Sequence, residues 1–443
     1  MTGEHGRARW PIVLVVLLAL VAAGAIALTG MVNARLASQR AGEGAVSAPS
    51  MPVLLDGEPR TGRFIAHLEF TSMAAPADAQ VSTDVAWDDD WFFQDPTVYN
   101  HELATTCSVL SAIANSESAY YQAGSGAPAY MEDALAELGF EDVSTASYQY
   151  RSEVIDEVVN LLTNSTDVTA YTIASKQVTN SQTGQEKTLL LVSIRGSYGS
   201  EWLSDANMGD PRELDLAEAD HRGFSEPANE VLSALTDRIE SIALNGGSVD
   251  DVALLFCGHS RGAAAANLAA SYADDYADSL RPLAPLDSIY AYTFACPRTT
   301  TMSNASDALY DNIWNVLNPA DMVPRMPLAA WGYTRFGHDL WLPEPGCEPF
   351  DETYDAMRSA FRENVGTESP YEPSDASTVD YFEDRLAEDI RAQDEFESIG
   401  GVASVVRHMA LDMNVMRVLY GHYPNVYIAW MQATSAEDLR LER

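Results

Sequence analysis

The first hydrophobic feature of the chain is a continuous apolar stretch, since residues 10 to 31 carry no charge. About 20 such residues are enough to cross the hydrocarbon core of a bilayer as a helix. Arg7 and Arg9 precede the stretch, which favours a cytoplasmic N-terminus over residues 1–9. A signal peptide has a shorter apolar core of about 7–15 residues. The pattern therefore favours an uncleaved transmembrane anchor over residues 10–32, with a cleaved signal segment and secretion as the alternative.

Beyond this stretch the hydrophobic pattern breaks off. Residues 33–60 are rich in Ala, Ser, Gly and Pro, which is typical of a flexible linker. The chain has 443 residues, of which 47% are apolar and 21% charged, so residues 61–443 can form one large domain with its own core. With an anchor or signal segment in front, this domain is expected outside the cytoplasm, at the cell membrane or secreted.

The hydrophobic pattern within the domain alternates between strand and helix. An alternating run at residues 171–174 and an apolar run at 189–194 flank a polar turn sequence, which predicts a β-hairpin. Apolar residues at helical spacing over 228–242 predict an amphipathic helix. The continuously apolar residues 252–257 predict a buried strand, and an alanine-rich stretch at 263–276 predicts a second helix.

Two further strands are predicted at residues 289–295 and 313–317. Strands that alternate with helices indicate an α/β domain with a mostly parallel central sheet and helices on both faces.

The most specific chemical signal is the sequence Gly-His-Ser-Arg-Gly at residues 258–262. Gly-x-Ser-x-Gly carries meaning when a strand precedes it and a helix follows it, and both are predicted here. The glycines allow a tight turn that exposes the Ser260 hydroxyl, and the helix N-terminus offers partial positive charge to a developing oxyanion. A chance pentapeptide is the alternative, but the context favours Ser260 as the nucleophile of an α/β-hydrolase.

An acidic residue follows the predicted strand 313–317. In this fold the acid of the triad comes after the serine and before the histidine. Asp321 lies just past the carboxyl end of that strand, where a carboxylate can orient an imidazole. The alternative is an Asp-x-x-Pro turn residue. After a nucleophile elbow, the pattern favours a catalytic role for Asp321.

Three histidines follow Asp321 and compete for the role of the base. His338 is only 17 residues further on, which leaves little room for another strand and its loop. His408 lies in a helical stripe of Val and Met and is predicted to be a histidine on the surface of a helix. His422 lies in a loop sequence before a short helix, and loops on a rigid scaffold concentrate catalytic groups. We therefore predict His422 as the base and keep His408 as the alternative.

The charge and the cysteine content bear on whether the chain binds nucleic acid or metal ions and whether it forms disulfides. The chain has 26 Lys and Arg against 65 Asp and Glu, a formal net charge of −39, which argues against nucleic-acid binding. The four cysteines show no metal-type spacing. Cys257 and Cys296 lie in predicted strands and are expected to be buried, whereas a disulfide between Cys107 and Cys347 is possible without support from the sequence.

With these residues assembled, the sequence resembles the class 3 lipases, a serine-hydrolase family of α/β fold. The resemblance covers about residues 168–327, and a weaker one covers 422–430. Its motifs occur in the family's order, and their spacing together is specific. They are Arg195-Gly196-Ser197, Glu201-Trp202-Leu203-Ser204-Asp205, His221-Arg222-Gly223-Phe224, the elbow, Thr293-Phe294-Ala295-Cys296-Pro297-Arg298 and Asp321-Met322-Val323-Pro324.

The resemblance implies an oxyanion hole formed by Ser197 and Arg261, through their backbone N–H groups and with help from the Ser197 hydroxyl. Two donors aimed at the tetrahedral oxygen are what acyl transfer requires. From the residues alone, Ser197 could equally be a turn residue. Arg261 stands where Leu is commoner in the family, so it brings a cation near the pocket and could favour a substrate with an acidic or phosphate head.

Two segments differ from the family pattern. Residues 199–220 occupy the position of the family's lid but are rich in Asp and Glu, so they are poorly suited to opening on lipid. The second segment, about 329–400, is an acidic insertion that we predict to be helical and able to cap the site. The polar lid weakens the case for interfacial triacylglycerol hydrolysis and leaves smaller or more soluble esters open.

Together these features predict a serine carboxylic-ester hydrolase, lipase or esterase, with the triad Ser260, Asp321 and His422. Such chemistry needs no metal and no organic cofactor. A serine peptidase or amidase on the same fold is the first alternative, because leaving-group specificity lies in the pocket and not in the triad. A surface-anchored binding module on a hydrolase scaffold that has lost activity is the second. The sequence leaves acyl-chain preference, lid behaviour and oligomeric state open.

Overall fold

The computed structural model describes residues 60–73, 78–117, 120, 126, 128–148, 169–196, 220, 222–348, 350–392, 401, 404, 407–408 and 411–442. The predicted anchor, almost all of the predicted linker, Ser197 and most of the lid segment lie outside these residues, so those expectations stay predictions. No helix in the described ranges is long and apolar enough to span a bilayer. Apart from Gly126, all described residues belong to one compact unit, residues 52–121 and 127–443.

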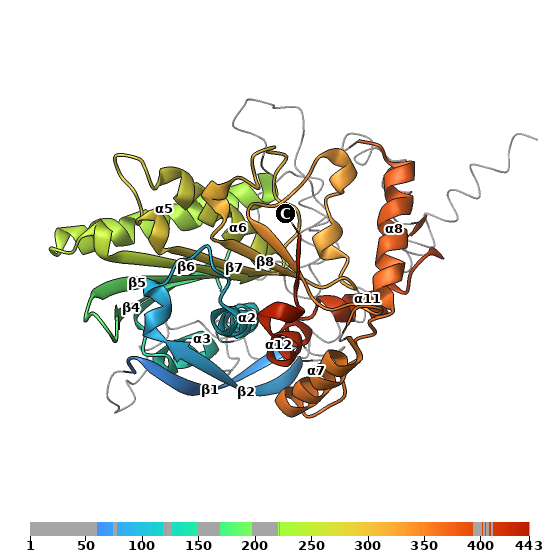
Figure 1. Ribbon diagram of the computed structural model, residues 1–443, viewed down its shortest axis with the longest axis horizontal. Coiled ribbons are helices and arrows are strands. Elements are labelled where there is room, and N and C mark those ends of the chain that lie inside the picture. The colour runs from blue at the N-terminus through green and yellow to red at the C-terminus, as the bar shows by residue number, and fades with distance from the viewer. Residues whose placement is uncertain are drawn as a thin grey trace, which may run out of the picture. The chain divides into compact units, whose positions relative to one another are not determined.

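An eight-stranded sheet forms the centre of this unit, with the strand order β10-β9-β8-β7-β6-β5-β4-β3 (Figure 1). The strands from β5 to β9 run parallel, whereas β3, β4 and β10 pair antiparallel at the two edges. The strands are β3 (Glu141–Ala146), β4 (Tyr171–Thr179), β5 (Glu186–Ile194), β6 (Val252–His259), β7 (Ile289–Phe294), β8 (Ile313–Leu317), β9 (His338–Trp341) and β10 (Arg440–Glu442).

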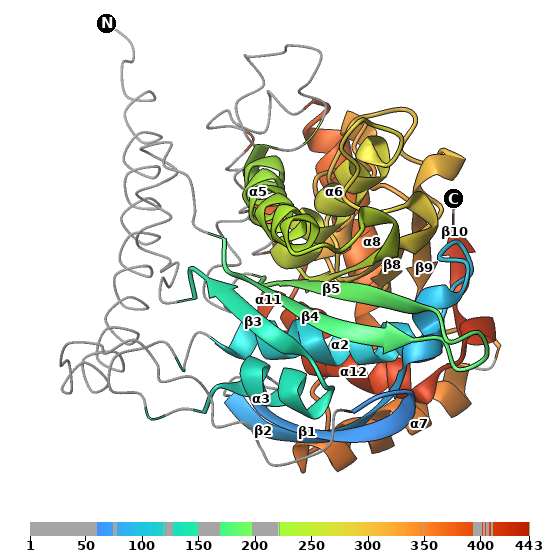
Figure 2. The ribbon, with the colours of Figure 1, turned by 90° about the vertical axis from the view of Figure 1, so that its left-hand side faces the viewer.

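Alternate residues of each central strand face two different cores, which explains why the strands read as continuously apolar. In β6, Leu254 and Phe256 pack with the helices α5 (Arg222–Leu244) and α6 (Arg261–Tyr276). Leu255 and Cys257 pack on the other side with α2 (His101–Ser116) and α12 (Pro424–Ala433). The predicted mostly parallel sheet with helices on both faces is confirmed (Figure 2).

A β-hairpin extends the core that α2 and α12 form on one side of the sheet. Strands β1 (Arg63–Met73) and β2 (Asp78–Asp88) pair antiparallel, and alternate β1 residues such as Leu68 and Phe70 are buried. The hairpin packs below α2 and beside α3 (Tyr130–Glu137), as Figures 1 and 2 show. The segment before residue 168, which lies outside the family resemblance, thus supplies α2, α3 and this hairpin on one side of the sheet.

The acidic insertion at 329–400 is only partly helical, and this corrects the prediction. It begins with a short 3-10 turn, η8 (Ala329–Trp331), and then forms β9 in the sheet. Two helices follow, α7 (Phe350–Val365) and α8 (Asp375–Asp389). Because the chain turns back through short 3-10 turns, 17 residues after Asp321 do suffice for another strand, which His338 begins.

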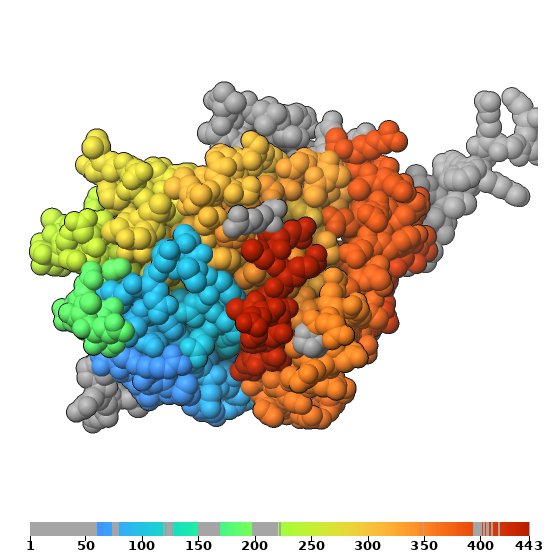
Figure 3. Space-filling model, viewed as in Figure 1, coloured from blue at the N-terminus to red at the C-terminus, as the bar shows by residue number. Residues whose placement is uncertain are grey.

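The α8 helix packs against the loop that follows β8. Met322 and Leu328 of that loop share a small buried cluster with Val379, Phe382 and Leu386 of α8. Arg325 of the loop also pairs with Asp380 at 2.7 Å. On the face shown in Figure 3, the C-terminal segment that contains α12 lies between the N-terminal elements and the region of α7 and α8.

The cysteines do not form the possible disulfide. Cys107 is buried in α2, Cys347 is exposed, and all four cysteines are free. Cys257 and Cys296 are buried, as predicted.

A buried carboxyl group at the end of α2 provides a test of the packing on the α2 side of the sheet. Glu117 is fully buried, its Oε2 accepts the Met131 N–H at 2.9 Å, and burial together with a hydrogen bond to Glu132 raises its pKa well above 4.5. The folded protein therefore holds a proton that the unfolded chain releases above pH 4.5, so this carboxyl group lowers stability as the pH rises.

We predict that Glu117→Gln flattens this decline. Between pH 5 and pH 9, urea unfolding should show that the wild type loses at least about 1.4 kcal/mol more stability than the variant, the value of one pKa unit. Glu240→Gln, on an exposed position of α5, is the matched control and should follow the wild type. Equal slopes for wild type and Glu117→Gln would contradict the prediction.

Candidate active site

The nucleophile turn has the geometry that the glycine pattern predicts. Ser260 lies between β6 and α6 with φ +59° and ψ −129°, a conformation that side chains rarely adopt. A Cβ on Gly258 would lie 2.4 Å from the Gly262 carbonyl oxygen, and one on Gly262 would lie 2.2 Å from the Ile194 carbonyl oxygen. Only glycine fits at both positions, so close packing holds the serine in its strained conformation.

The predicted base and acid meet at this turn. The Nε2 atom of His422 lies 2.9 Å from the Ser260 Oγ, and its Nδ1 atom lies 2.8 Å from the Asp321 Oδ2. A carboxylate only accepts, so Nδ1 donates to Asp321 and Nε2 is left to accept the serine proton. Asp321 is fully buried and Ser260 nearly so. The structure therefore brings together the three residues that the sequence singled out.

The loop carrying Asp321 is held by hydrogen bonds within the site. The Val323 N–H donates to Asp321 Oδ1 at 2.9 Å, and the Tyr427 hydroxyl donates to Oδ2 at 2.8 Å. Burial and the Asp321 charge raise the pKa of Tyr427, so its hydroxyl remains a donor. Tyr427 comes from α12, directly after the turn η9 (Leu419–His422) that carries the histidine.

Asn318 joins the acid loop to the histidine turn. Its Nδ2 donates to the Gly421 carbonyl at 2.8 Å, while its own N–H donates to the Tyr427 hydroxyl oxygen at 3.1 Å. The Tyr371 hydroxyl donates to the Asn318 Oδ1 at 3.2 Å. These bonds fix Asp321 and His422 as one unit, although they are about 100 residues apart in sequence.

His408 has a different environment from the one predicted. It is buried, and its ring nitrogens contact Asp412 and, at 2.9 Å, Asp389 at the end of α8. The prediction of a surface histidine was wrong, because the side chain is buried and both of its ring nitrogens contact carboxylates. His338 is also engaged elsewhere, with its Nε2 3.0 Å from Asp311 and its ring stacked on Trp314.

The residues predicted for the oxyanion hole are only partly within the described chain. Arg261 is half-buried as the first residue of α6, where the helix N-terminus carries partial positive charge. Gly196 precedes Ser197 and lies against the nucleophile, since a Cβ there would be 3.3 Å from the Ser260 Cβ and 2.4 Å from the His259 carbonyl oxygen.

Two residues beside the triad were not predicted. His259 is buried, its ring centroid lies 4.8 Å from that of His422, and burial together with the charge of His422 holds its pKa well below 6.5. Asn115 of α2 contacts both His259 and Gly196. No sequence signal marks Asn115, because it lies on an apolar helix far from every motif.

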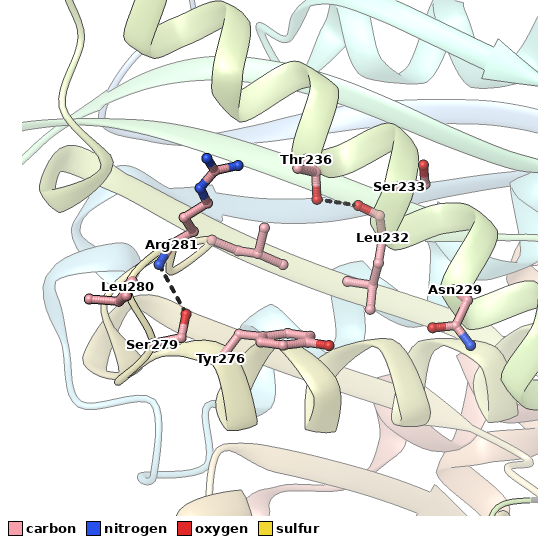
Figure 4. Close-up of a pocket in the computed structure, with 9 residues that line it drawn as sticks. Asn229, Leu232, Ser233, Thr236, Tyr276, Ser279, Leu280 and Arg281 are labelled. Carbon is pink, nitrogen blue, oxygen red and sulfur yellow. Dashed lines mark hydrogen bonds between the residues drawn. The ribbon is translucent and has the colours of Figure 1, made fainter. Parts of the chain in front are cut away.

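A groove between α5 and α6 lies away from these groups (Figure 4). Its volume is about 520 Å³, and Leu232, Tyr276 and Leu280 are among its lining residues. Ser260 and Tyr276 lie at opposite ends of α6, so at 1.5 Å per residue they are roughly 24 Å apart. Among the described residues, no group of three or more His, Cys, Asp or Glu could hold a metal ion.

Comparison with known proteins agrees with the motif analysis. Residues 191–331 match the family model "Lipase (class 3)". No curated protein matches the chain. Similar solved structures include a triacylglycerol lipase described as having a serine protease triad as its catalytic centre, with 20% identity over 56% of this chain and 82% of that one and a TM-score of 0.38.

A second is a Rhizomucor miehei lipase propeptide complex, with 19% identity over 55% of this chain and 70% of that one and a TM-score of 0.38. A third is the Aspergillus oryzae mono- and diacylglycerol lipase, with 23% identity over 41% of this chain and 62% of that one and a TM-score of 0.28. Because these TM-scores are low, the fold assignment rests on the strand order and the elbow of this chain. Residues 191–331, which contain the nucleophile turn and the acid loop, are thus similar to the class 3 lipases, and this match supports a lipase-like carboxylic-ester hydrolase.

Proposed function

We propose that the chain hydrolyses a carboxylic ester through a Ser260–His422–Asp321 triad. The observation that supports this most directly is the pair of contacts of one imidazole, 2.9 Å to the Ser260 Oγ and 2.8 Å to the Asp321 Oδ2. In this geometry His422 can accept the serine proton as Ser260 Oγ attacks the acyl carbon, and the buried carboxylate stabilises the imidazolium that forms.

The reaction then follows the usual two halves of acyl transfer. The C–O bond to the leaving alcohol breaks as His422 returns the proton to the alcohol oxygen, which leaves an acyl ester on Ser260. Water then adds to this ester with His422 as the base, and the acid product departs. The N–H groups of Ser197 and Arg261 are our candidates for binding the oxyanion in both steps. No cofactor enters this scheme.

The substrate that we propose is a small or soluble ester, with a preference for an anionic head. The acidic lid segment argues against opening on a lipid surface. The guanidinium of Arg261 follows the nucleophile directly and is the cation nearest to it in sequence. We also retain the proposal that residues 10–32 tether the chain to a membrane, with the hydrolase outside the cytoplasm.

The nucleophile can be tested with an active-site probe. A fluorophosphonate should label the wild-type protein, because an activated serine is the nucleophile that displaces its fluoride, and Ser260→Ala should abolish the labelling. Ser271→Ala, a buried serine of the same helix, is the control and should still be labelled. Labelling that persists in Ser260→Ala would refute the assignment.

The role of Tyr427 can be tested separately. Removing its hydroxyl takes one hydrogen bond from a buried carboxylate, a loss of roughly 1.5–3 kcal/mol. We expect Tyr427→Phe to lower kcat at least about tenfold with little change in KM. Tyr381→Phe, exposed on α8, is the control. A kcat equal to that of the wild type would show that the Tyr427 hydroxyl does not support Asp321 in catalysis.

Substrate class can be decided with a panel of soluble esters, long-chain glycerides, phospholipids and amides. We expect turnover of soluble esters to exceed that of emulsified glycerides, and kcat/KM to be higher for an ester with an anionic head than for its neutral isostere. The Arg261→Leu variant should reduce this ratio by about tenfold, since it removes one charge contact. Amide turnover without ester turnover would instead favour a peptidase or amidase.

A further inference from the structure

We propose that Asn115 is a positioning residue for acyl transfer, which fixes the approach to the oxyanion segment at Gly196 and the tautomer of His259 beside the catalytic histidine. This inference rests on the proposed ester hydrolysis by Ser260. Asn115 lies in the last turn of α2, outside residues 191–331 that match the family.

The first contact of Asn115 is with the backbone at the end of β5. The Gly196 N–H donates to the Asn115 Oδ1 at 2.7 Å. Gly196 has no space for a side chain, because a Cβ would lie 2.4 Å from the His259 carbonyl oxygen and 3.2 Å from the Asn115 Oδ1. The peptide plane before Gly196 is therefore fixed from two sides.

This contact bears on catalysis because the next N–H along the chain belongs to Ser197, our candidate oxyanion donor. An oxyanion donor must lie within a few tenths of an ångström of its productive position to stabilise the transition state. The peptide that joins residues 195 and 196 sets the direction in which the chain leaves Gly196 toward Ser197. Asn115 holds this peptide through its hydrogen bond to the Gly196 N–H.

The second contact is with the elbow histidine. The Asn115 Nδ2 lies 3.3 Å from the His259 Nδ1. Since Oδ1 already accepts from the Gly196 N–H, the amide cannot be turned around without opposing two donors. Nδ2 must therefore donate, Nδ1 must accept, and His259 is held as the neutral tautomer with its proton on Nε2.

A neutral His259 matters because of what lies beside it. Its ring is 4.8 Å from the ring of His422 and 5.5 Å from the ring of Tyr427, and these are the titratable side chains that face it from the histidine turn and α12 in the described chain. Asp321 lies behind both. His422 becomes positively charged when it accepts the serine proton, so a second imidazolium at His259 would oppose the reaction. A donor at Nδ1 opposes that protonation.

Two substitutions separate the contacts. Asn115→Leu removes both hydrogen bonds and keeps the branched shape of the side chain. Asn115→Asp keeps the acceptor for Gly196 at nearly constant volume but replaces the donor to His259 by a carboxylate, which favours the charged ring. Ser116→Ala is the matched control, because the Ser116 hydroxyl donates only to Ala112 of its own helix at 3.1 Å.

The experiment measures kcat and KM on a soluble ester from pH 5 to 9, together with ¹⁵N NMR of histidine-labelled protein in which the His259 signals are identified from His259→Gln. We expect Asn115→Leu to lower kcat by about 10²-fold, the effect of losing an oxyanion donor, with KM within about threefold. Asn115→Asp should lose activity mainly at low pH and recover as the pH rises, while its His259 nitrogens shift toward the protonated form. Ser116→Ala should match the wild type.

The outcomes keep the two proposals apart. A wild type that neither turns over esters nor reacts with fluorophosphonate would refute the proposed function. An active wild type with kcat within threefold in Asn115→Leu, or with unchanged His259 signals and pH profile in Asn115→Asp, would overturn the inference about Asn115 alone. If Asn115→Leu does not fold, Asn115→Asp decides, because it preserves the contact with Gly196.

Discussion

The strained backbone of Ser260 is the constraint on which the rest of the site depends. A side chain at φ +59° persists only where the surroundings leave no alternative. Here the turn is fixed by backbone contacts: α6 starts against the end of β5 at Gly262, and the Ser260 N–H donates to the Phe294 carbonyl of β7 at 2.9 Å. Three neighbouring parallel strands thus determine where one hydroxyl lies, and every other catalytic group has to reach that point.

The acid and the base reach it on loops, and buried polar groups give those loops the rigidity that a sheet gives the serine. Asn318 and Tyr427 join the acid loop to the histidine turn. On the other side, the buried Arg335 donates to the Pro324 carbonyl at 2.8 Å, and Arg298 donates to the Pro327 carbonyl at 3.0 Å. These guanidinium groups supply the donors that a buried loop backbone requires.

Buried cations need counter-charges, and this gives a structural role to part of the acidic insertion. Burial and the charge of Arg335 lower the pKa of Arg298 to about 10, and Glu383 of α8 opposes that shift from 3.0 Å. Asp339 of β9 pairs with Arg335. A stretch that appears in sequence only as an acidic excess therefore places specific carboxylates against the arginines that hold the acid loop. The remaining excess charge is available for solubility.

How much could be predicted from the sequence follows from the range of the interactions involved. The hairpin β4–β5, the helices α5 and α6, and the strands β6 to β8 were predictable because each has a local apolar period, and Ser260 was predictable because a local turn needs both glycines. Asp321 and His422 followed from chain order. The exposure of His408 was predicted wrongly, because hydrophobic periodicity shows on which face of a helix a residue lies but not what packs against that face. The β9 strand was missed because four residues carry too little pattern.

Asn115, by contrast, could not be predicted from any local sequence pattern. Its two partners are 81 and 144 residues away, and they come together only because α2 packs beneath β5 and β6 in the layer that the motif-free N-terminal segment forms. An asparagine near the end of an apolar helix carries no sequence signal for a catalytic role, because polar residues are common where a helix ends. The family's motifs define which atoms react, whereas the packing of a layer outside those motifs determines how accurately these atoms are held.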